Sequence, residues 1–316
     1  MERSCGPDPG GERLNPWPSC WSRPGPTHAT SLASYGEDSI SRRHGRKGGS
    51  RLLCLRKGVR TLSDRSAIEW TDATWNPVTG CSKVSPGCAH CYAEVLSLRF
   101  GWSRLSWAPE NASANVILHP ERLDQPLHWR EARRVFVNSM SDLFHELVPD
   151  QFIFEVFNRM ARANWHSYQL LTKRPERMAE VVGSYYAQRR EVEPMAHVWL
   201  GTSIENDRWT GRADALRRTP AAVRFISAEP LLGPLPSLDL TDIDWLIVGG
   251  ESGARARPMH PDWARNLRDQ ALAAGVALFF KQWGGRTPKA GGRELDGQTW
   301  DHYPAVSRTL AELVAV

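Results

Sequence analysis

Three cysteines lie close together in the stretch GCSKVSPGCAHCY, which runs from Gly80 to Tyr92. They are Cys81, Cys88 and Cys91, and their spacing is Cys-x6-Cys-x2-Cys. Three thiolates on one loop fit a [4Fe–4S] cluster that is bound at three of its irons, with the fourth iron open to another molecule. An open iron suggests that S-adenosylmethionine is chelated there and cleaved with one electron to a 5′-deoxyadenosyl radical. The loop therefore predicts a cluster with a vacant coordination position.

Two other uses of these cysteines stay open. A structural zinc ion takes four protein ligands, so zinc would need a histidine in addition to the three thiolates. His90 is a poor candidate, because it would place three ligands within the four residues from Cys88 to Cys91. A disulfide between Cys88 and Cys91 would leave Cys81 without a role. The remote histidines that could complete a Cys3His site are His119, His145 and His260.

Charge is distributed unevenly along the chain, which has 316 residues and a formal net charge of +5. Residues 1–64 hold 11 basic and 6 acidic residues, so the remainder is neutral by count. A neutral domain gives no general electrostatic support for nucleic-acid binding, although a local basic patch stays open. No stretch approaches the roughly 18 apolar residues of a membrane helix, and the N-terminus has no apolar secretion signal. We expect a cytoplasmic protein without membrane contact.

The N-terminal segment is rich in Gly, Pro, Ser and Arg and has no sustained helical or strand period. We predict that residues 1–62 form a disordered tail and that residues 63–316 form a single domain. One hypothesis is that the tail is a translation-start artefact, because ordered-looking sequence begins abruptly at Ser66. Its cysteines, which we expect to be free thiols, are Cys5, Cys20 and Cys54.

Short apolar runs alternate with longer helical stretches from Arg134 onward. Near-continuous apolar runs are typical of strands that are covered on both faces, and repeated βα units imply parallel strands. The expected fold is therefore α/β, a partial or complete (β/α) TIM-like barrel of parallel strands, with a doubly wound sheet as the runner-up. Expected strands cover residues 135–138, 168–172, 198–202, 224–227, 245–248 and 277–281, with a first strand before the cysteine loop, and expected helices cover 151–162, 177–190 and 262–274.

Polar residues follow each of these strands. The carboxyl ends of parallel strands face one side of an α/β fold, where active sites lie. One such cluster could be a helix cap, but six in register predict the lining of a site. Basic members would bind a carboxylate or phosphate, or would pair with Glu229 or Glu251. We expect Asn138, Ser139, Asp142, Thr172, Lys173, Ser203 and Glu205 to bind a cofactor, and Glu229, Glu251 and Lys281 to act in catalysis.

Residues 101–131 interrupt the βα rhythm. This segment contains Trp102, Trp107 and Trp129. We interpret it as a lid or a surface for a partner.

The cysteine loop resembles that of the radical S-adenosylmethionine enzymes, which place three cysteines after the first strand of a partial (β/α) barrel, most often as Cys-x3-Cys-x2-Cys. The first gap here is six residues, so the match is to a variant of that pattern. The chain more closely resembles a phage-type protein family of unknown function that is defined by this three-cysteine motif. The segments that carry this resemblance are EWTDATWNPVTGCSKVSPGCAHCYAE, VFVNSMSDLFH, LLTKRPERM, VWLGTSIEN, ISAEPLLGP, WLIVGGESGARARPM and FFKQWGG.

The resemblance implies that Cys81, Cys88 and Cys91 are cluster ligands, and that Asn138 or Asp142 contacts the methionyl amino group of the cofactor. The expected function is that of a radical S-adenosylmethionine-like iron–sulfur enzyme acting on a nucleotide, a nucleic acid or another macromolecule. It would need an electron donor for cluster reduction, and a protein partner is a further candidate. The alternative is a zinc-binding Cys3His module that binds nucleic acid or protein without radical chemistry.

Overall fold

Seven strands pair side by side in the order in which they occur along the chain, in a computed structural model that describes residues 66–190, 193–287 and 289–305. All of these residues belong to one unit, Gly58–Val316. The predicted tail, residues 1–62, lies outside the described residues.

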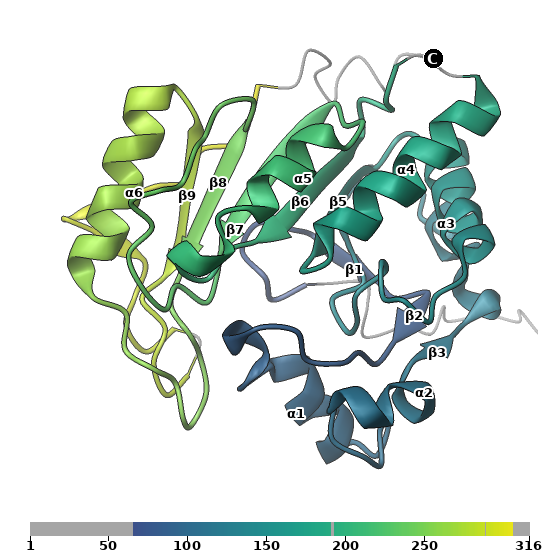
Figure 1. Ribbon diagram of the computed structural model, residues 1–316, viewed down its shortest axis with the longest axis horizontal. Coiled ribbons are helices and arrows are strands. Elements are labelled where there is room, and N and C mark those ends of the chain that lie inside the picture. Colours follow the sequence, from purple (N-terminus) through teal and green to yellow (C-terminus); the bar gives the residue numbers. More distant parts are fainter. Residues whose placement is uncertain (1–65, 191–192, 288, 306–316) are drawn as a thin grey trace, which may run out of the picture. The chain divides into compact units, whose positions relative to one another are not determined.

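The large sheet is parallel throughout (Figure 1). Its order, without a reversal, rules out the doubly wound alternative, in which the strand order turns back at a switch point. The predicted strands are confirmed to within one or two residues. They are β1 (Ala73–Trp75), β4 (Arg134–Val137), β5 (Ser167–Thr172), β6 (Val198–Ser203), β7 (Val223–Ala228), β8 (Trp245–Gly249) and β9 (Ala277–Gln282).

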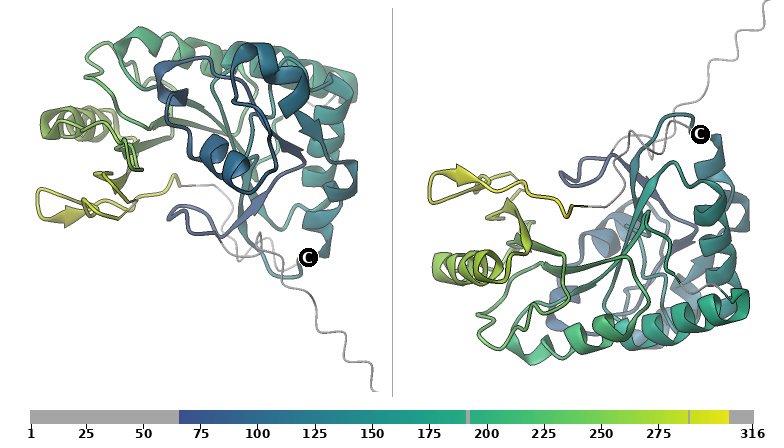
Figure 2. Two further views of the ribbon diagram at one scale, coloured as in Figure 1. Left: turned by 90° about the horizontal axis from the view of Figure 1, so that it is seen from below. Right: turned by 90° about the horizontal axis from the view of Figure 1, so that it is seen from above.

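The sheet curls into an open half-barrel, and the helices that follow its strands cover the outer face (Figure 2). No pairing joins β1 to β9 among the described residues, so the partial form of the predicted barrel is the one observed. The last helix of this layer ends at Gly275, whose φ of +68° is the left-handed conformation that glycine adopts easily. These helices are α3 (Asp150–Arg162), α4 (Pro175–Arg189), α5 (Arg212–Arg218) and α6 (Pro261–Ala274).

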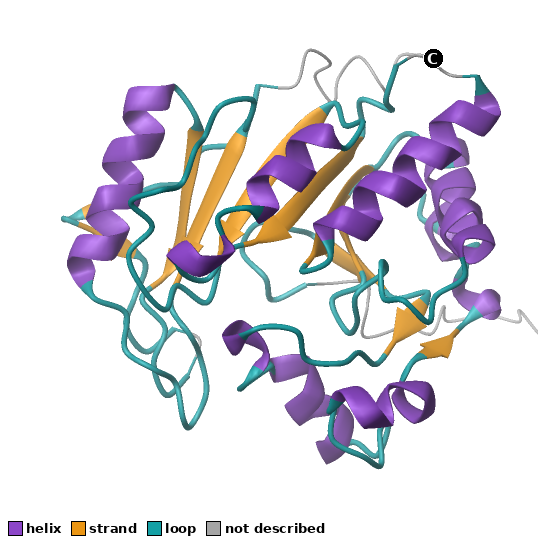
Figure 3. Cartoon of the chain, viewed as in Figure 1, coloured by secondary structure: helices purple, strands orange, loops and turns teal. Residues whose placement is uncertain are grey.

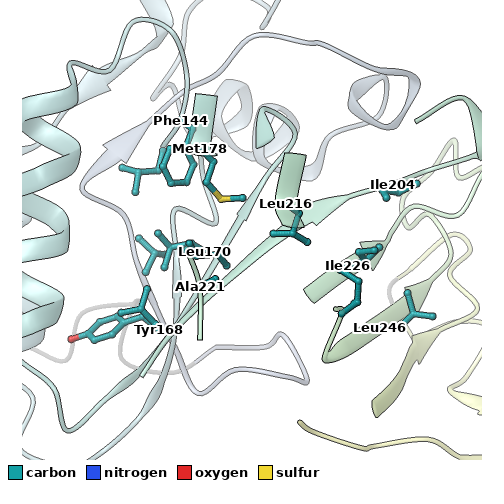
Figure 4. Packing of buried hydrophobic residues seen from close by; sticks show 14 of the residues in the cluster. Phe144, Tyr168, Leu170, Met178, Ile204, Leu216, Ala221, Ile226 and Leu246 are labelled. Atoms are coloured by element: carbon teal, nitrogen blue, oxygen red, sulfur yellow. The ribbon is translucent and has the colours of Figure 1, made fainter. Parts of the chain in front are cut away.

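Apolar side chains are buried on both faces of the sheet, as the continuous apolar strands predict. On the outer face, residues such as Leu170, Ile226 and Leu246 pack in the layer beneath the helices (Figure 4). On the inner face, Trp245 packs edge-on against Trp199, with their ring centroids 5.9 Å apart. Because aromatic rings fill the concave side, the polar strand ends are left to form the site.

Several short elements separate β1 from β4 along the chain. Those around the cysteine loop, such as α1 (Tyr92–Arg99), are drawn apart from the main sheet in Figure 3. Trp107 and Trp129 of this segment are buried, whereas Trp102 is 56% exposed. The described helices are too short or too polar to cross a lipid bilayer. The remaining elements are β2 (Val78–Thr79), η2 (Pro86–Cys88), α1 (Tyr92–Arg99), η3 (Pro109–Asn111), α2 (Ala112–Asn115), β3 (Ile117–Leu118), η4 (Pro120–Arg122), η5 (Gln125–His128), η6 (Asp207–Trp209), β10 (Glu294–Leu295) and β11 (Gln298–Thr299).

Candidate functional site

The cysteine loop begins directly after β2, which follows β1 closely along the chain. Gly80 has a φ of +80°, and a Cβ there would overlap the carbonyl oxygen of Asn115. Only glycine fits this turn. The chain then forms the single 3-10 turn η2, and Cys91 lies at the N-cap of α1.

All three thiols line one cavity of about 150 Å³. Six of the residues predicted to bind a cofactor line the same cavity, at or just beyond the carboxyl ends of β4, β5 and β6. The prediction that polar strand ends gather beside the cysteines is therefore met for these six. They are Asn138, Ser139, Asp142, Thr172, Lys173 and Ser203.

The thiols are held in an environment that opposes their ionisation. Burial of the sulfur raises the pKa of Cys81 to about 12, and the carboxylate of Asp142 adds to this effect. Burial also raises the pKa of Cys91, while the ammonium group of Lys173 acts in the opposite direction. A thiol must lose its proton to bind a metal, so ligation here would be coupled to proton release.

Arg174 contacts the first residues of the cysteine loop. Its guanidinium donates to Cys81 Sγ at 3.5 Å, to Ser82 Oγ at 3.0 Å and to Asp142 Oδ2 at 3.2 Å. Burial would lower the pKa of Arg174, but the charges of Asp142 and Glu146 and the contact with Cys81 together outweigh burial and raise the pKa. Arg174 therefore stays positive next to Cys81 and favours the ionised form of this thiol.

Glu205, predicted as a cofactor-binding residue, contacts the cysteine loop. Its side chain is fully buried, and Ser85 Oγ donates to it at 2.5 Å. Arg212 donates to the same carboxylate at 3.1 Å, and Lys173 Nζ lies 3.6 Å away. Glu205 thus connects the end of β6 to the middle of the cysteine loop. A Cβ at Gly87 would overlap this carboxylate, so the contact also depends on a glycine.

Glu251, predicted as catalytic, is a second anchor. His90 Nδ1 lies 3.0 Å from one carboxylate oxygen, and Arg257 donates to the carboxylate from both its backbone and its guanidinium. Arg257 also donates to the carbonyl oxygen of Pro86 at 3.0 Å. Burial would raise the pKa of Glu251, but the bonds from Arg257 and His90 outweigh it and lower the pKa to about 2. This carboxylate is ionised, and both of its oxygens contact Arg257 or His90.

Lys281 and Glu229, the other two residues predicted as catalytic, form an ion pair with 2.5 Å between Nζ and Oε1. This is the pairing that the sequence left open as an alternative to anion binding. Neither residue is among those that line the cysteine cavity. Both side chains are mostly buried, with exposures of 17% and 18%.

Asn138 differs from all of these residues. It is 2% exposed, and within the described part of the chain neither its side-chain oxygen nor its side-chain nitrogen has a hydrogen-bond partner. Its φ of +63° is the left-handed conformation, which is uncommon for a residue other than glycine. A buried amide without partners is costly, so this one, which lines the cysteine cavity, has the properties of a ligand contact.

A family model described as "Protein of unknown function (DUF5131)" matches residues 65–304. The chain belongs to this family. No curated protein matches it significantly. The match spans nearly all of the described residues, so the cysteine loop and the half-barrel are both parts of the DUF5131 unit.

Solved structures of spore photoproduct lyase are similar to this DUF5131 chain in part. The lyase complexed with dinucleoside spore photoproduct is 13% identical, with a TM-score of 0.38, and the match covers 67% of this chain and 64% of the lyase. A cysteine-to-serine mutant is 14% identical, with the same TM-score and coverages of 61% and 59%. The chain thus spans about three fifths of the length of these lyases. A likeness this distant assigns no ligand and no reaction to it.

Each histidine considered for zinc has a hydrogen-bond partner in this DUF5131 chain, and the partner of His145 belongs to the cysteine loop. His119 Nε2 lies 2.8 Å from Thr79 Oγ1, and His145 Nε2 lies 2.8 Å from Ser82 Oγ. His260 accepts from a backbone amide at the start of α6. No histidine and no fourth cysteine is among the described residues that line the cavity.

Metal binding would require the thiols to move closer together. As the described part of the chain lies here, no group of three or more His, Cys, Asp or Glu side chains is arranged to hold a metal ion. The three thiols nevertheless share one cavity, and Cys88 is close enough to influence the pKa of both Cys81 and Cys91. The donor set of three soft thiolates suits an iron–sulfur cluster.

Proposed function

We propose that Cys81, Cys88 and Cys91 hold a [4Fe–4S] cluster and that the protein is a radical S-adenosylmethionine enzyme. One observation carries the proposal: three thiols from one loop line a single cavity in which the described residues supply no fourth soft ligand. When bound, such a cluster would supply one electron that cleaves S-adenosylmethionine at its open iron to a 5′-deoxyadenosyl radical.

The neighbouring residues of the chain support this use of the cavity. Arg174 would stabilise the thiolate form of Cys81 through its hydrogen bond to the sulfur. The amide of Asn138 would give one donor and one acceptor to the amino and carboxylate groups of the cofactor. Glu205 and Glu251 would hold the loop in place from β6 and from the end of β8.

An anionic substrate is supported by a second hollow beside the first. This hollow, of about 280 Å³, shares Val84 and Lys173 with the cysteine cavity. Arg208 and Arg212 also line it, with Glu176 as the acidic member. Arg212 and Lys173 already face the carboxylate of Glu205, so a phosphate or carboxylate group in this hollow would rely mainly on Arg208. Such an anion would be part of the nucleotide or nucleic-acid substrate that we propose.

Anaerobic reconstitution with iron and sulfide tests this function. We expect a brown protein with about four irons per chain that releases 5′-deoxyadenosine from S-adenosylmethionine in the presence of a strong reductant. Cys81→Ala, Cys88→Ala and Cys91→Ala should each lose both properties. Cys54→Ala is the matched control, because it removes a thiol outside the motif, and it should retain both. Stoichiometric zinc without iron in the native protein would contradict the proposal and favour the binding module.

A further inference from the structure

Exposed apolar side chains follow the cysteine loop directly. Besides Tyr92, five of them, on α1 and the residues after it, have exposures between 41% and 57%. Figure 1 shows α1 apart from the helices that cover the sheet. A surface this rich in apolar side chains marks an interaction site more often than a solvated face. These side chains, which we call the α1 patch, are Val95, Leu98, Phe100, Trp102 and Leu105.

The charges within the α1 patch are positive. Arg99 and Arg104 are exposed there, and the guanidinium of Arg99 lies 5.7 Å from the ring centroid of Phe100. The single acidic residue of the segment from 92 to 106 is Glu94, which is buried and paired with Lys83 at 2.8 Å. Aromatic and arginine side chains are enriched in protein interfaces, whereas exposed Lys and Glu are depleted. Charge complementarity calls for an acidic partner.

The α1 patch fits a protein better than a nucleic acid. Single-stranded nucleic acid is bound by aromatic rings on which bases stack and by a basic groove. Phe100 and Trp102 instead pack on each other, with centroids 5.3 Å apart and planes inclined by 32°. The aliphatic Val95, Leu98 and Leu105 give nothing to a base or a phosphate but fit an apolar protein surface.

We propose that the α1 patch is the docking surface for an acidic protein that delivers electrons to the cysteine loop. This inference rests on the proposed function, since it requires a cluster to reduce. Cys91 is the N-cap of α1, and a helix of eight residues is only about 12 Å long, so a partner on the patch would lie close to the cluster ligands. Redox encounters use small interfaces, below about 1,200 Å², which a patch of this size would provide.

The transfer is a single-electron step. The reduced donor loses one electron, the oxidised cluster gains it, and no atom or proton needs to move between the two proteins. The donor then leaves in its one-electron-oxidised form. A weak complex that forms and dissociates quickly suits this exchange, because the electron is required once for each cleavage of S-adenosylmethionine.

The test compares a protein donor with a small one. Reconstituted protein is mixed with an acidic flavodoxin in its fully reduced form or with dithionite, and cluster bleaching is followed by stopped flow. In Arg99→Glu and in Trp102→Ala we expect the rate with flavodoxin to fall by about tenfold or more, and the rate with dithionite to stay unchanged. The rate with flavodoxin should also fall with added salt.

Two control variants lie away from the patch. Leu272→Ala removes an apolar side chain of α6 that is 52% exposed, and Arg218→Glu reverses an exposed charge on α5. Both should keep the wild-type rate with either donor. Equal rates in patch and control variants would overturn the inference, as would a wild-type cluster that dithionite reduces but flavodoxin does not.

Other occupants of the patch would give different results. Sedimentation that shows a dimer dissociated by Trp102→Ala would assign the patch to a second copy of the chain and would overturn the inference. Inhibition of flavodoxin by a single-stranded oligonucleotide that no longer binds Arg99→Glu would assign it to nucleic acid, with the same consequence. Failure to assemble any cluster would contradict the proposed function itself. This outcome is distinguishable from the others, because dithionite would then cause no bleaching either.

Discussion

Replacing Glu205 by leucine should destabilise the protein by about 3 to 5 kcal/mol, the usual cost of breaking a buried ion pair by removal of one partner. The carboxylate is fully buried, and Arg212, its partner at 3.1 Å, is only 5% exposed. Without Glu205, the described contacts of the Arg212 guanidinium retain one acceptor, the carbonyl oxygen of Ser203 at 2.8 Å. Ser85 would lose its acceptor as well. The cost is therefore that of an uncompensated buried cation rather than that of a lost contact.

Urea unfolding of the apo protein, followed by tryptophan fluorescence, measures this change. In thermal unfolding, a domain of this size loses about 2 to 4 °C in Tm per kcal/mol, so the Tm should fall by about 6 to 20 °C. The double variant Glu205→Leu with Arg212→Leu removes both charges and should recover most of the loss. Asp214→Ala, which removes an exposed partner of Arg217, should cost less than about 0.5 kcal/mol. A cost below about 1 kcal/mol for Glu205→Leu, or a double variant as unstable as the sum of its parts, would refute the reasoning.

Three further outcomes follow from the same structure. Gly87→Ala should reduce the iron content after reconstitution, because its Cβ overlaps the Glu205 carboxylate, whereas Gly183→Ala has open space and should not. Asn138→Gly keeps the left-handed backbone and removes only the amide, so iron loading should persist while calorimetry shows binding of S-adenosylmethionine weakened by about tenfold, or roughly 1.4 kcal/mol. Burial lowers the pKa of His166 from 6.5 to about 4, so the unfolded state binds the proton more tightly and stability should fall as the pH drops from 6.5 to 4. The loss should reach up to about 3 kcal/mol in urea unfolding and should be reduced in His166→Gln, and a flat pH profile for the wild type would contradict this account.

The strands of the half-barrel could be predicted from the sequence because each is a short, nearly continuous apolar run. Residues 245–248 and 198–202 are buried on both faces of the sheet, and for this reason nearly all of their side chains are apolar. The first strand is less distinct, because the described β1 contains only three residues. Helix α1 was missed because its sequence has no apolar stripe that packs on the sheet, and Val95 and Leu98 are exposed. Helix α5 was missed because it has only seven residues, three of them arginine.

The roles within the site were harder to predict than its location. That polar residues gather at the strand ends follows from parallel topology alone. Which of them face the cavity and which pair with each other depends on contacts between residues far apart in sequence, such as Ser85 with Glu205, 120 positions away, and His90 with Glu251, 161 positions away. No local pattern encodes such pairs. The GESGARARPM motif contains both Glu251 and Arg257, but a separation of six positions does not reveal that these two charges bind each other.

The ion pairs of the site restrict where a ligand can be recognised. Glu205, Glu251 and Arg174 each contact the cysteine loop, so they are committed to holding it and have little capacity left for a cofactor. Lys281 is committed to Glu229. Asn138 therefore stands out in the cavity as a buried polar side chain without a partner in the described chain, and it is also held in a strained backbone conformation. A fold keeps such a residue only where something repays the strain, and a bound ligand next to the three thiols would do so.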